Sequence, residues 1–287
     1  PFLENLTGAT YYNGILVNKD LTEAYKWYKR AAEKGLDLAQ FNVALSYYYG
    51  EGVQKDIQKA IYWYTKAAEQ NYLFAQFELG KIYYYGAGVD KDFQKAIYWY
   101  TKAADQGSAE AQNNLGYIYY YGKGVNQDFE EAVIWFKKAA DQGHLDALNN
   151  LGLAYRNGEG VGENLEKAFQ NLRYAADKGY SYSQNNLGFM YLNGDYVDLD
   201  LKESFKWFKL AAKQNLDFAQ VNLGNAYYNG DGTKQDFEKA VYWYTQAANQ
   251  GFEGGQNNLA EAYYTGKGVN QNIPEAFKNY KLAADQG

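Results

Sequence analysis

The sequence contains no cysteine and only one histidine, His144, among 287 residues. The lack of cysteine excludes disulfides, thiolate nucleophiles and cysteine-ligated zinc. One histidine cannot by itself form a histidine-based metal site or a repeated acid–base device. These absences exclude most common catalytic constellations, and we expect no catalytic residue, no metal site and no cofactor.

A strong charge of one sign and a long apolar run are also missing. The 34 acidic and 28 basic residues give a net charge of −6, and no stretch is basic enough to neutralise the phosphates of a nucleic acid. No window approaches the run of about 18 apolar residues that a membrane-spanning helix needs. We therefore expect no nucleic acid partner and no membrane insertion.

What the sequence does contain is an internal repeat of 36 residues. A turn glycine recurs at position 14 of every repeat, without one insertion or deletion, as Gly14, Gly50, Gly86, Gly122, Gly158, Gly194, Gly230 and Gly266. Strict spacing of this kind indicates stacked units rather than several domains. The sequence thus predicts a single solenoid domain over 1–287, with repeats at 1–36, 37–72, 73–108, 109–144, 145–180, 181–216, 217–252 and 253–287.

Each repeat predicts two helices. In the first helix, Ala75, Leu79, Gly80 and Tyr83 recur at helical spacing, and the turn glycine ends it. The second helix opens on a residue whose side-chain oxygen can accept from a first-turn N–H, namely Asp20, Asp56, Asp92, Asp128, Asn164, Asp200, Asp236 or Asn272. Glycine or asparagine then ends it, as Gly35, Asn71, Gly107, Gly143, Gly179, Asn215, Gly251 and Gly287.

The segment from Ala75 to Ala104 shows the full pattern, Ala-x3-Leu-Gly-x2-Tyr-x2-Gly-x-Gly-Val-x2-Asp-x2-Lys-Ala-x2-Trp-Tyr-x-Lys-Ala-Ala. It resembles the Sel1-like repeat, a relative of the tetratricopeptide repeat with a longer turn between its helices. The resemblance implies an all-α, right-handed α/α solenoid of eight helix-turn-helix repeats, forming a tetratricopeptide-like superhelix. It also implies an interaction adaptor, the role of most family members. The β-lactam-binding branch of the family has disulfide-linked helix pairs, which cannot form here.

The first helices are expected to line the concave surface of the solenoid, as in related helix-pair solenoids. Counted from the start of each repeat, positions 5, 6, 9, 12 and 13 fall opposite the core stripe. Asparagine recurs there, at position 6 as Asn42, Asn114, Asn150, Asn186, Asn222 and Asn258, and at position 5 as Asn113, Asn149 and Asn185. Because an amide both donates and accepts, such a row suits the backbone of an extended peptide. The amides could instead bond between adjacent repeats and stabilise the stack, and both interpretations stay open.

Tyrosine is the second residue type of this surface. At position 12 stand Tyr48, Tyr84, Tyr120, Tyr228 and Tyr264, with Arg156 in the fifth repeat, and at position 13 stand Tyr49, Tyr85 and Tyr121. A tyrosine ring offers a large apolar face and a polar tip at low entropic cost, which binding surfaces favour. The first half of the expected groove is therefore more aromatic, and the second half is more amidic.

These features predict a non-enzymatic protein–protein interaction scaffold that binds a segment of a partner polypeptide on the concave surface. Glycan binding is the alternative, since sugars also stack on aromatic rings and bond to amides. End-to-end self-association is a third possibility, because neither end has an evident polar cap. An enzyme of glycans would need paired carboxylates, yet the acids expected on this surface, Glu78 and Glu261, lie five repeats apart.

The compartment stays open on the sequence alone. The abundance of Asn, Lys, Tyr and Ile suggests an AT-rich genome. As the resemblance implies, relatives occur in bacterial periplasms, among secreted factors of intracellular bacteria and in the lumen of the endoplasmic reticulum. We favour a bacterial protein that is periplasmic or secreted.

Overall fold

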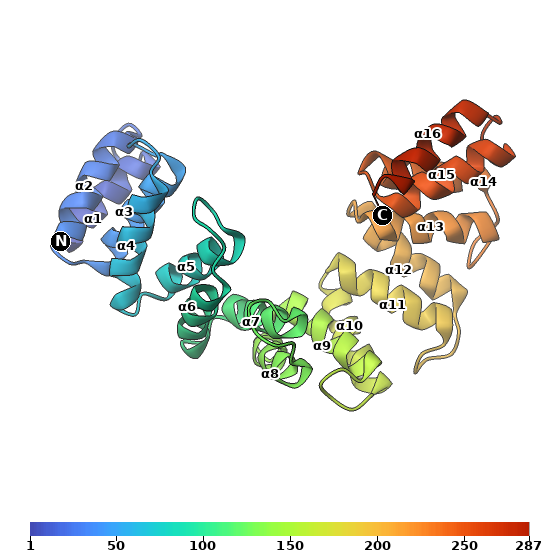
Figure 1. The fold of residues 1–287 in the computed structure, drawn as a ribbon, viewed down its shortest axis with the longest axis horizontal. Helices are drawn as coiled ribbons and strands as arrows, with labels where there is room; N and C mark the ends of the chain where they lie inside the picture. Colours follow the sequence, from blue (N-terminus) through green and yellow to red (C-terminus); the bar gives the residue numbers. More distant parts are fainter. Residues whose placement is uncertain (287) are drawn as a thin grey trace. The chain divides into compact units, whose positions relative to one another are not determined.

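The computed structural model describes residues 1–286, and within them sixteen α-helices follow one another without a strand (Figure 1). The last predicted helix-ending residue, Gly287, lies outside the described residues. The predicted all-α repeat solenoid is confirmed, because every repeat is a pair of helices joined by a turn. The first helices are α1 (Phe2–Asn13), α3 (Asp37–Tyr49), α5 (Leu73–Tyr85), α7 (Ala109–Tyr121), α9 (Leu145–Asn157), α11 (Ser181–Asn193), α13 (Asp217–Asn229) and α15 (Glu253–Thr265).

The second helices alternate with them along the chain. They are α2 (Leu21–Glu33), α4 (Ile57–Glu69), α6 (Phe93–Asp105), α8 (Phe129–Ala140), α10 (Leu165–Asp177), α12 (Leu201–Lys213), α14 (Phe237–Asn249) and α16 (Ile273–Ala284). The helices form two compact units. The first unit, Pro1–His144, contains the first four repeats, and the second unit begins at Leu145 and contains the other four. Within each unit, every helix packs against the next one in the chain.

The helix ends lie where the capping residues predict them. All eight predicted Asp and Asn residues accept a hydrogen bond from a backbone N–H of the helix that they open. The glycine after each first helix has a φ between 63° and 85°, which glycine adopts without strain. The turn is also tied to the first helix, because the N–H of Asp92 donates to the carbonyl of Tyr83 at 2.9 Å. Local sequence therefore determines the length of every helix.

Close packing of the two helices in a repeat depends on a small residue at position 8. A Cβ on Gly80 would lie 2.4 Å from the ring of Tyr100, whose side chain is only 1% exposed. At Gly152 in the second unit, the facing residue is Leu172, and the nearest atom would be 2.8 Å away. Contacts this short are repulsive, so glycine lets the two helices approach each other.

A pair of glutamines, which the sequence analysis did not anticipate, links the two ends of most repeats. Gln76 is 1% exposed and donates to the carbonyl of Ala68 in the preceding repeat at 3.1 Å, while its carbonyl accepts from Gln106 at 2.7 Å. The pair satisfies buried polar groups that would otherwise be unpaired. It recurs as Gln40–Gln70, Gln112–Gln142, Gln184–Gln214, Gln220–Gln250 and Gln256–Gln286.

Two repeats replace this glutamine pair. In the first repeat an ion pair of 2.7 Å joins Glu4 and Lys34. In the fifth repeat the two positions hold Leu148 and Lys178, and leucine has no group that could take part in a hydrogen bond. The fifth repeat is also the repeat at which the second unit begins.

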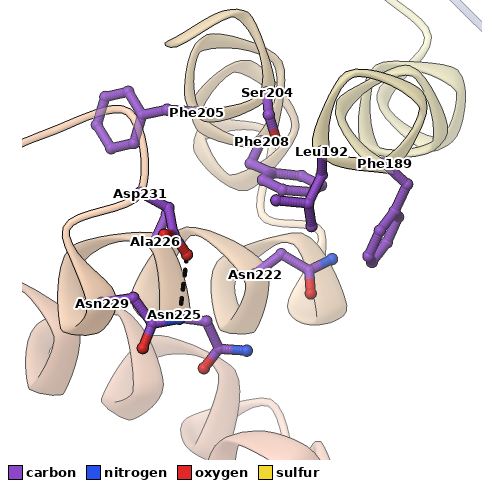
Figure 2. A pocket seen from close by; sticks show the side chains of 10 residues that line it. All are labelled: Phe189, Leu192, Ser204, Phe205, Phe208, Asn222, Asn225, Ala226, Asn229 and Asp231. Carbon is purple, nitrogen blue, oxygen red and sulfur yellow. Dashed lines mark hydrogen bonds between the residues drawn. The ribbon is translucent and has the colours of Figure 1, made fainter. Parts of the chain in front are cut away.

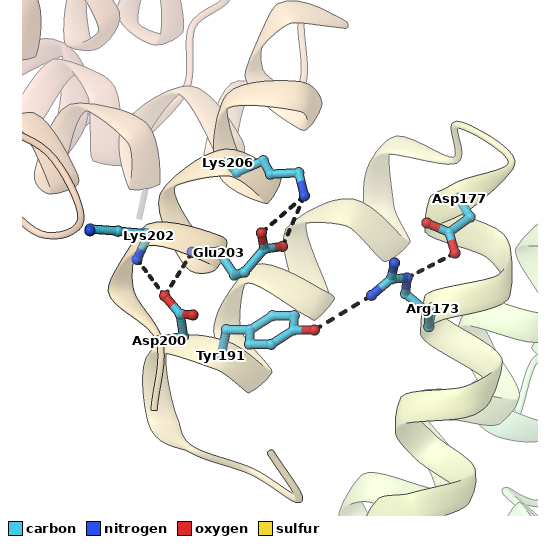
Figure 3. Close-up of polar contacts among 7 residues, drawn as sticks. All are labelled: Arg173, Asp177, Tyr191, Asp200, Lys202, Glu203 and Lys206. Atoms are coloured by element: carbon cyan, nitrogen blue, oxygen red, sulfur yellow. Dashed lines mark hydrogen bonds and ion pairs between the residues drawn. The ribbon is translucent and has the colours of Figure 1, made fainter. Parts of the chain in front are cut away.

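Charged side chains on the second helices pair mainly with neighbours one turn away. In α12, Lys206 binds both carboxylate oxygens of Glu203 at 3.0 Å (Figure 3). In α10, Arg173 binds Asp177 at 2.8 Å and donates to the hydroxyl of Tyr191 at 3.5 Å (Figure 3). Exposed pairs of this kind contribute only a few tenths of a kcal/mol, so the stability of the fold comes from the core and its buried polar groups.

Candidate functional site

We use the name first-helix face for positions 5, 6, 9, 12 and 13 of the first helices. The structure corrects the expected placement of its position-5 asparagines. Asn113, Asn149 and Asn185 are buried, with exposed fractions of 2 to 4%. At this position the side chain turns toward the neighbouring repeat rather than outward. These three amides are therefore not available on the surface for an extended peptide.

The asparagines at position 6 are half-buried, and four of them donate a hydrogen bond to the preceding repeat. Asn186 donates to the carbonyl oxygen of Asn149 at 2.9 Å, and Asn222 donates to that of Asn185 at 2.8 Å. Two further members of the row, Asn42 and Asn258, donate to Asn5 at 3.0 Å and to Asn225 at 3.2 Å. Asn114 lies beside the hydroxyl of Tyr100, and Asn150 is half-buried. These contacts support the interpretation that the amides stabilise the stack, because they use the donors that a peptide would need.

The tyrosines of the first unit form exposed pairs. In α3, α5 and α7 the position-12 ring is half-buried and the position-13 ring is exposed, the exposed fractions of Tyr49, Tyr85 and Tyr121 being 62%, 64% and 56%. The two rings of a pair meet edge to face, with centroid distances of 5.0 Å for Tyr48–Tyr49 and 4.9 Å for both Tyr84–Tyr85 and Tyr120–Tyr121. Such pairs fix the exposed ring in one orientation.

The inner rings of the second and third pairs are anchored on an aromatic residue of the second helix. The ring of Tyr84 lies 5.5 Å from that of Phe93, and Tyr120 lies 5.1 Å from Phe129. Burial raises the pKa of Tyr84 above that of a free phenol, with smaller contributions from Tyr85 and Tyr121. The hydroxyl consequently stays protonated at neutral pH. The first unit thus presents uncharged aromatic surface with hydroxyl groups at its edge.

In the second unit, position 12 holds Arg156, Leu192, Tyr228 and Tyr264. Arg156 donates from Nε and Nη2 to one carboxylate oxygen of Asp195, at 3.1 and 2.7 Å. The hydroxyl of Tyr228 accepts from Lys267 at 2.8 Å, and Tyr264 is exposed. Position 13 holds Asn157, Asn193, Asn229 and Thr265. At position 13, polar side chains therefore replace the exposed rings of the first unit.

A pocket of about 200 Å³ opens on the first-helix face of the second unit. Figure 2 shows Phe189, Leu192 and Phe208 on one side of it and amide groups on the other. Asp231 completes the polar side, and its carboxylate accepts from the amide of Asn229 at 3.0 Å. The pocket combines an apolar wall with one carboxylate, a mixture that suits an amphipathic side chain better than a whole small molecule.

Sequence reasoning missed this pocket because it treated position 12 alone. In the second unit, position-12 side chains meet position 15 of the next repeat in the pairs Arg156–Asp195 and Tyr228–Lys267. The column at position 15 reads Ile15, Glu51, Ala87, Lys123, Glu159, Asp195, Asp231 and Lys267. Alignment of the two columns would have shown that the partner of Asp231 is Leu192, which cannot bond to it.

The described residues contain no group of three or more His, Asp or Glu side chains that could hold a metal ion. Glu78, one of the two acids expected on this face, forms an ion pair of 3.0 Å with Lys81. Glu261, the other acid, accepts from the hydroxyl of Tyr280 at 2.8 Å. Within residues 1–286, no helix has the length and apolar character needed to cross a membrane.

Comparison with known proteins identifies the repeat. The sequence profile of the Sel1 repeat matches residues 4–36, 37–72, 73–108, 109–144, 145–180, 181–216, 217–252 and 254–287. A crystal structure of a Sel1 repeat protein from Oxalobacter formigenes is 31% identical, with a TM-score of 0.81, over 99% of this chain and 83% of that one.

A second solved structure shares the fold. It is c5321, described as a protective antigen of uropathogenic Escherichia coli strains with an SLR fold, and it is 28% identical with a TM-score of 0.57. The match covers 99% of this chain and 80% of that one. No curated protein matches the chain.

Proposed function

We propose that this chain, which belongs to the Sel1 repeat family, binds an extended segment of a partner polypeptide on the first-helix face of its first unit. Members of this family generally mediate protein–protein interactions and are generally not catalytic. The observation that supports this site most is the row of exposed tyrosines Tyr49, Tyr85 and Tyr121. They recur at intervals of one repeat, so an extended segment can contact one ring after another.

The chemistry of this row favours a polypeptide. Each exposed ring is held edge-on by the tyrosine before it, so little side-chain entropy is lost when a ligand packs against it. Tyrosine is enriched among the residues that dominate binding energies at protein interfaces. Its hydroxyl can donate to or accept from a peptide backbone. The row therefore supplies both apolar contact and hydrogen bonds without adding charge.

The proposal can be tested with peptides selected from a random display library against the intact chain. We expect an enriched peptide to bind the native chain, and the triple variant Tyr49→Ser, Tyr85→Ser, Tyr121→Ser to bind it at least about tenfold more weakly by calorimetry. The control is Tyr62→Ser with Tyr98→Ser, because these tyrosines are similarly exposed at 55% and 53% but belong to second helices.

Two results would contradict the proposal. Equal peptide affinity of the triple variant and the native chain would place the binding site elsewhere. Selection of no peptide, together with tyrosine-dependent binding of oligosaccharides on a glycan array, would favour the glycan alternative. Circular dichroism of the triple variant checks that any loss of binding is not a loss of folding.

A further inference from the structure

The contact between position 12 of one repeat and position 15 of the next has a fully paired example in the second unit. Arg156 places two guanidinium nitrogens on one oxygen of Asp195, at 3.1 and 2.7 Å. The two side chains are only 26% and 25% exposed, so water screens this ion pair less than a surface pair. It shows how this scaffold binds a guanidinium group between two adjacent repeats.

One repeat further along the chain, the same two positions hold Leu192 and Asp231. Leucine is shorter than arginine and has no hydrogen-bonding group, so it neither fills the space nor pairs with the carboxylate. The pocket of about 200 Å³ lies at this point, and both residues line it (Figure 2). Its opening between these two residues is thus explained by the substitution of leucine for arginine.

The carboxylate of Asp231 keeps capacity for a cation. Among the described residues it accepts a hydrogen bond only from Asn229, at 3.0 Å, and it forms no ion pair with a lysine or arginine. An ionised carboxylate offers about four acceptor sites, and hydrogen bonds to charged groups are about twice as strong as neutral ones. The carboxylate can therefore bind a second, charged donor.

We propose that the pocket between Leu192 and Asp231 binds an arginine side chain of a partner polypeptide, in the place that Arg156 occupies one repeat earlier. The guanidinium group binds the Asp231 carboxylate, and the aliphatic stem of the arginine packs against Leu192 and Phe208. The net charge of −6 favours a cationic ligand.

The size and shape of the pocket support a single side chain. Its volume is below the roughly 300 to 1,000 Å³ of pockets that hold drug-sized ligands. Arginine fits better than lysine because the Arg156–Asp195 contact uses two guanidinium nitrogens, whereas an ammonium group is a compact point charge. The inference rests on the proposed function only in that the arginine belongs to a polypeptide, and it does not involve the tyrosine row.

The direct test uses Nα-acetyl-arginine amide as the probe and follows the amide signals of the intact chain by NMR. We expect binding in the range of about millimolar, as for other small fragments, with shifts at the side-chain amides of Asn225 and Asn229. Asp231→Asn should weaken binding about tenfold or more. Nα-acetyl-citrulline amide has the same shape as the arginine probe but no charge. Its affinity for the native chain should be as low as the affinity of the arginine probe for Asp231→Asn.

Two further variants exchange the residues of the adjacent repeats. Leu192→Arg should fill the pocket with an internal guanidinium, abolish probe binding and raise the melting temperature by a few degrees. Arg156→Leu should open an equivalent pocket at Asp195, so that the chain binds two molecules of the probe instead of one. The matched control is Asp195→Asn in the native background, which should leave the affinity at Asp231 unchanged.

Several outcomes would overturn the proposal. Equal binding of the probe to Asp231→Asn, or equal binding of citrulline and arginine probes to the native chain, would show that the carboxylate does not select a guanidinium. Tighter binding of free arginine than of the blocked probe would assign the pocket to the amino acid rather than to a polypeptide.

The test also separates this inference from the proposed function. The variant with Tyr49→Ser, Tyr85→Ser and Tyr121→Ser should bind the arginine probe normally, because none of these residues lines the pocket. Loss of peptide binding in that variant with intact probe binding would support both proposals. If Asp231→Asn binds the peptide normally and the native chain does not bind the probe, the arginine pocket is contradicted and the proposed function is not.

Discussion

The two units share one backbone plan and differ in what they place at the same positions. At position 13 the first unit exposes Tyr49, Tyr85 and Tyr121, while the second unit has Asn157, Asn193, Asn229 and Thr265. At position 28, which is buried in the first seven repeats and half-buried in the eighth, the first unit has Tyr28, Tyr64, Tyr100 and Phe136, while the second has Leu172, Phe208, Tyr244 and Tyr280.

This comparison separates two kinds of position. Position 28 holds tyrosine, phenylalanine or leucine, because a large side chain of the second helix must fill the space opposite the small residue at position 8. At position 13 an aromatic ring and a short amide are equally compatible with the fold. Positions that the fold leaves free are the ones at which the two units have acquired different surfaces.

The largest expected difference between the units appears at alkaline pH. Burial raises the pKa of Tyr28 to about 12 and raises the pKa values of Tyr64 and Tyr100 further, all in the first unit. In the second unit, Tyr244 is the buried phenol of this kind. Partial burial and a hydrogen bond to Glu261 also raise the pKa of Tyr280 to about 12, but water screens this half-buried residue more strongly. Because the folded pKa exceeds the unfolded value near 10, the protonated phenol stabilises the fold. This stability is complete below about pH 10 and is lost as the pH rises toward the folded pKa.

Each buried phenol should reduce the free energy of unfolding by about 1.4 kcal/mol per pH unit above 10, so three phenols give about 4 kcal/mol at pH 11. We expect subtilisin at pH 11 to cleave first within Pro1–His144, with cut sites mapped by mass spectrometry. Tyr64→Phe, which cannot ionise, should delay this cleavage. First cleavage after Leu145 would show that phenol burial does not set the order of unfolding.

The next prediction compares the glycines at position 8. Gly80→Ala should destabilise the chain by about 1 to 2 kcal/mol, because the new Cβ meets the fully buried ring of Tyr100 and overpacking exceeds the gain in helix propensity. Gly152→Ala should change stability by less than about 0.5 kcal/mol, because the flexible side chain of Leu172 can move aside. Urea denaturation of both variants measures the difference.

Alanine already stands at position 8 in the second repeat, as Ala44, and this limits how large the cost of Gly80→Ala can be. The second repeat has alanine at position 8 opposite Tyr64, so a repeat can be built around a Cβ when its other contacts are adjusted to it. A cost of Gly80→Ala as small as that of Gly152→Ala would mean that such adjustment is available in the third repeat too. The difference between the rigid ring of Tyr100 and the flexible side chain of Leu172 would then have no effect on stability.

An effect of similar size is expected at the buried amides of the second unit. Asn185→Ala should reduce the free energy of unfolding by about 1 to 2 kcal/mol, since it removes the acceptor for Asn222. Asn257→Ala is the matched control, because this residue has the same position in the eighth repeat but is exposed. A double-mutant cycle of Asn185 and Asn222 should give a coupling energy of about 1 kcal/mol. No coupling would mean that the amides do not stabilise the stack.

The sequence predicted the fold well because its signals are local and repeated. The caps at Asp56 or Asp92 and the left-handed glycines follow from single residues, and the 36-residue spacing predicts their stacking. The face was harder to predict, because position 5 lies at the border between the core stripe and the surface. Burial of Asn185 there depends on the neighbouring repeat, which a helical periodicity does not include. The Asp231 pocket likewise depends on a pair of residues in different repeats.

The smallest stability effect is expected at the surface tyrosines, and it is the most informative about function. Tyr85→Ser should change the free energy of unfolding by less than about 0.5 kcal/mol, because 64% of the residue is exposed. Tyr84→Ser should cost about 2 kcal/mol, since that ring packs against Phe93 and Tyr100. Asn193→Ser, at the equivalent of Tyr85 in the second unit, should be neutral as well. Thermal denaturation of the three variants tests this order.

A large loss from Tyr85→Ser would mean that the exposed rings belong to the fold. Their recurrence in α3, α5 and α7 would then need no ligand to explain it. A neutral result leaves three large aromatic side chains that the fold does not require, each oriented by a neighbouring ring. Because exposed apolar surface favours association, residues of this kind persist on a stable scaffold most readily where a partner covers them. The neutral result would therefore strengthen the assignment of this face to partner binding.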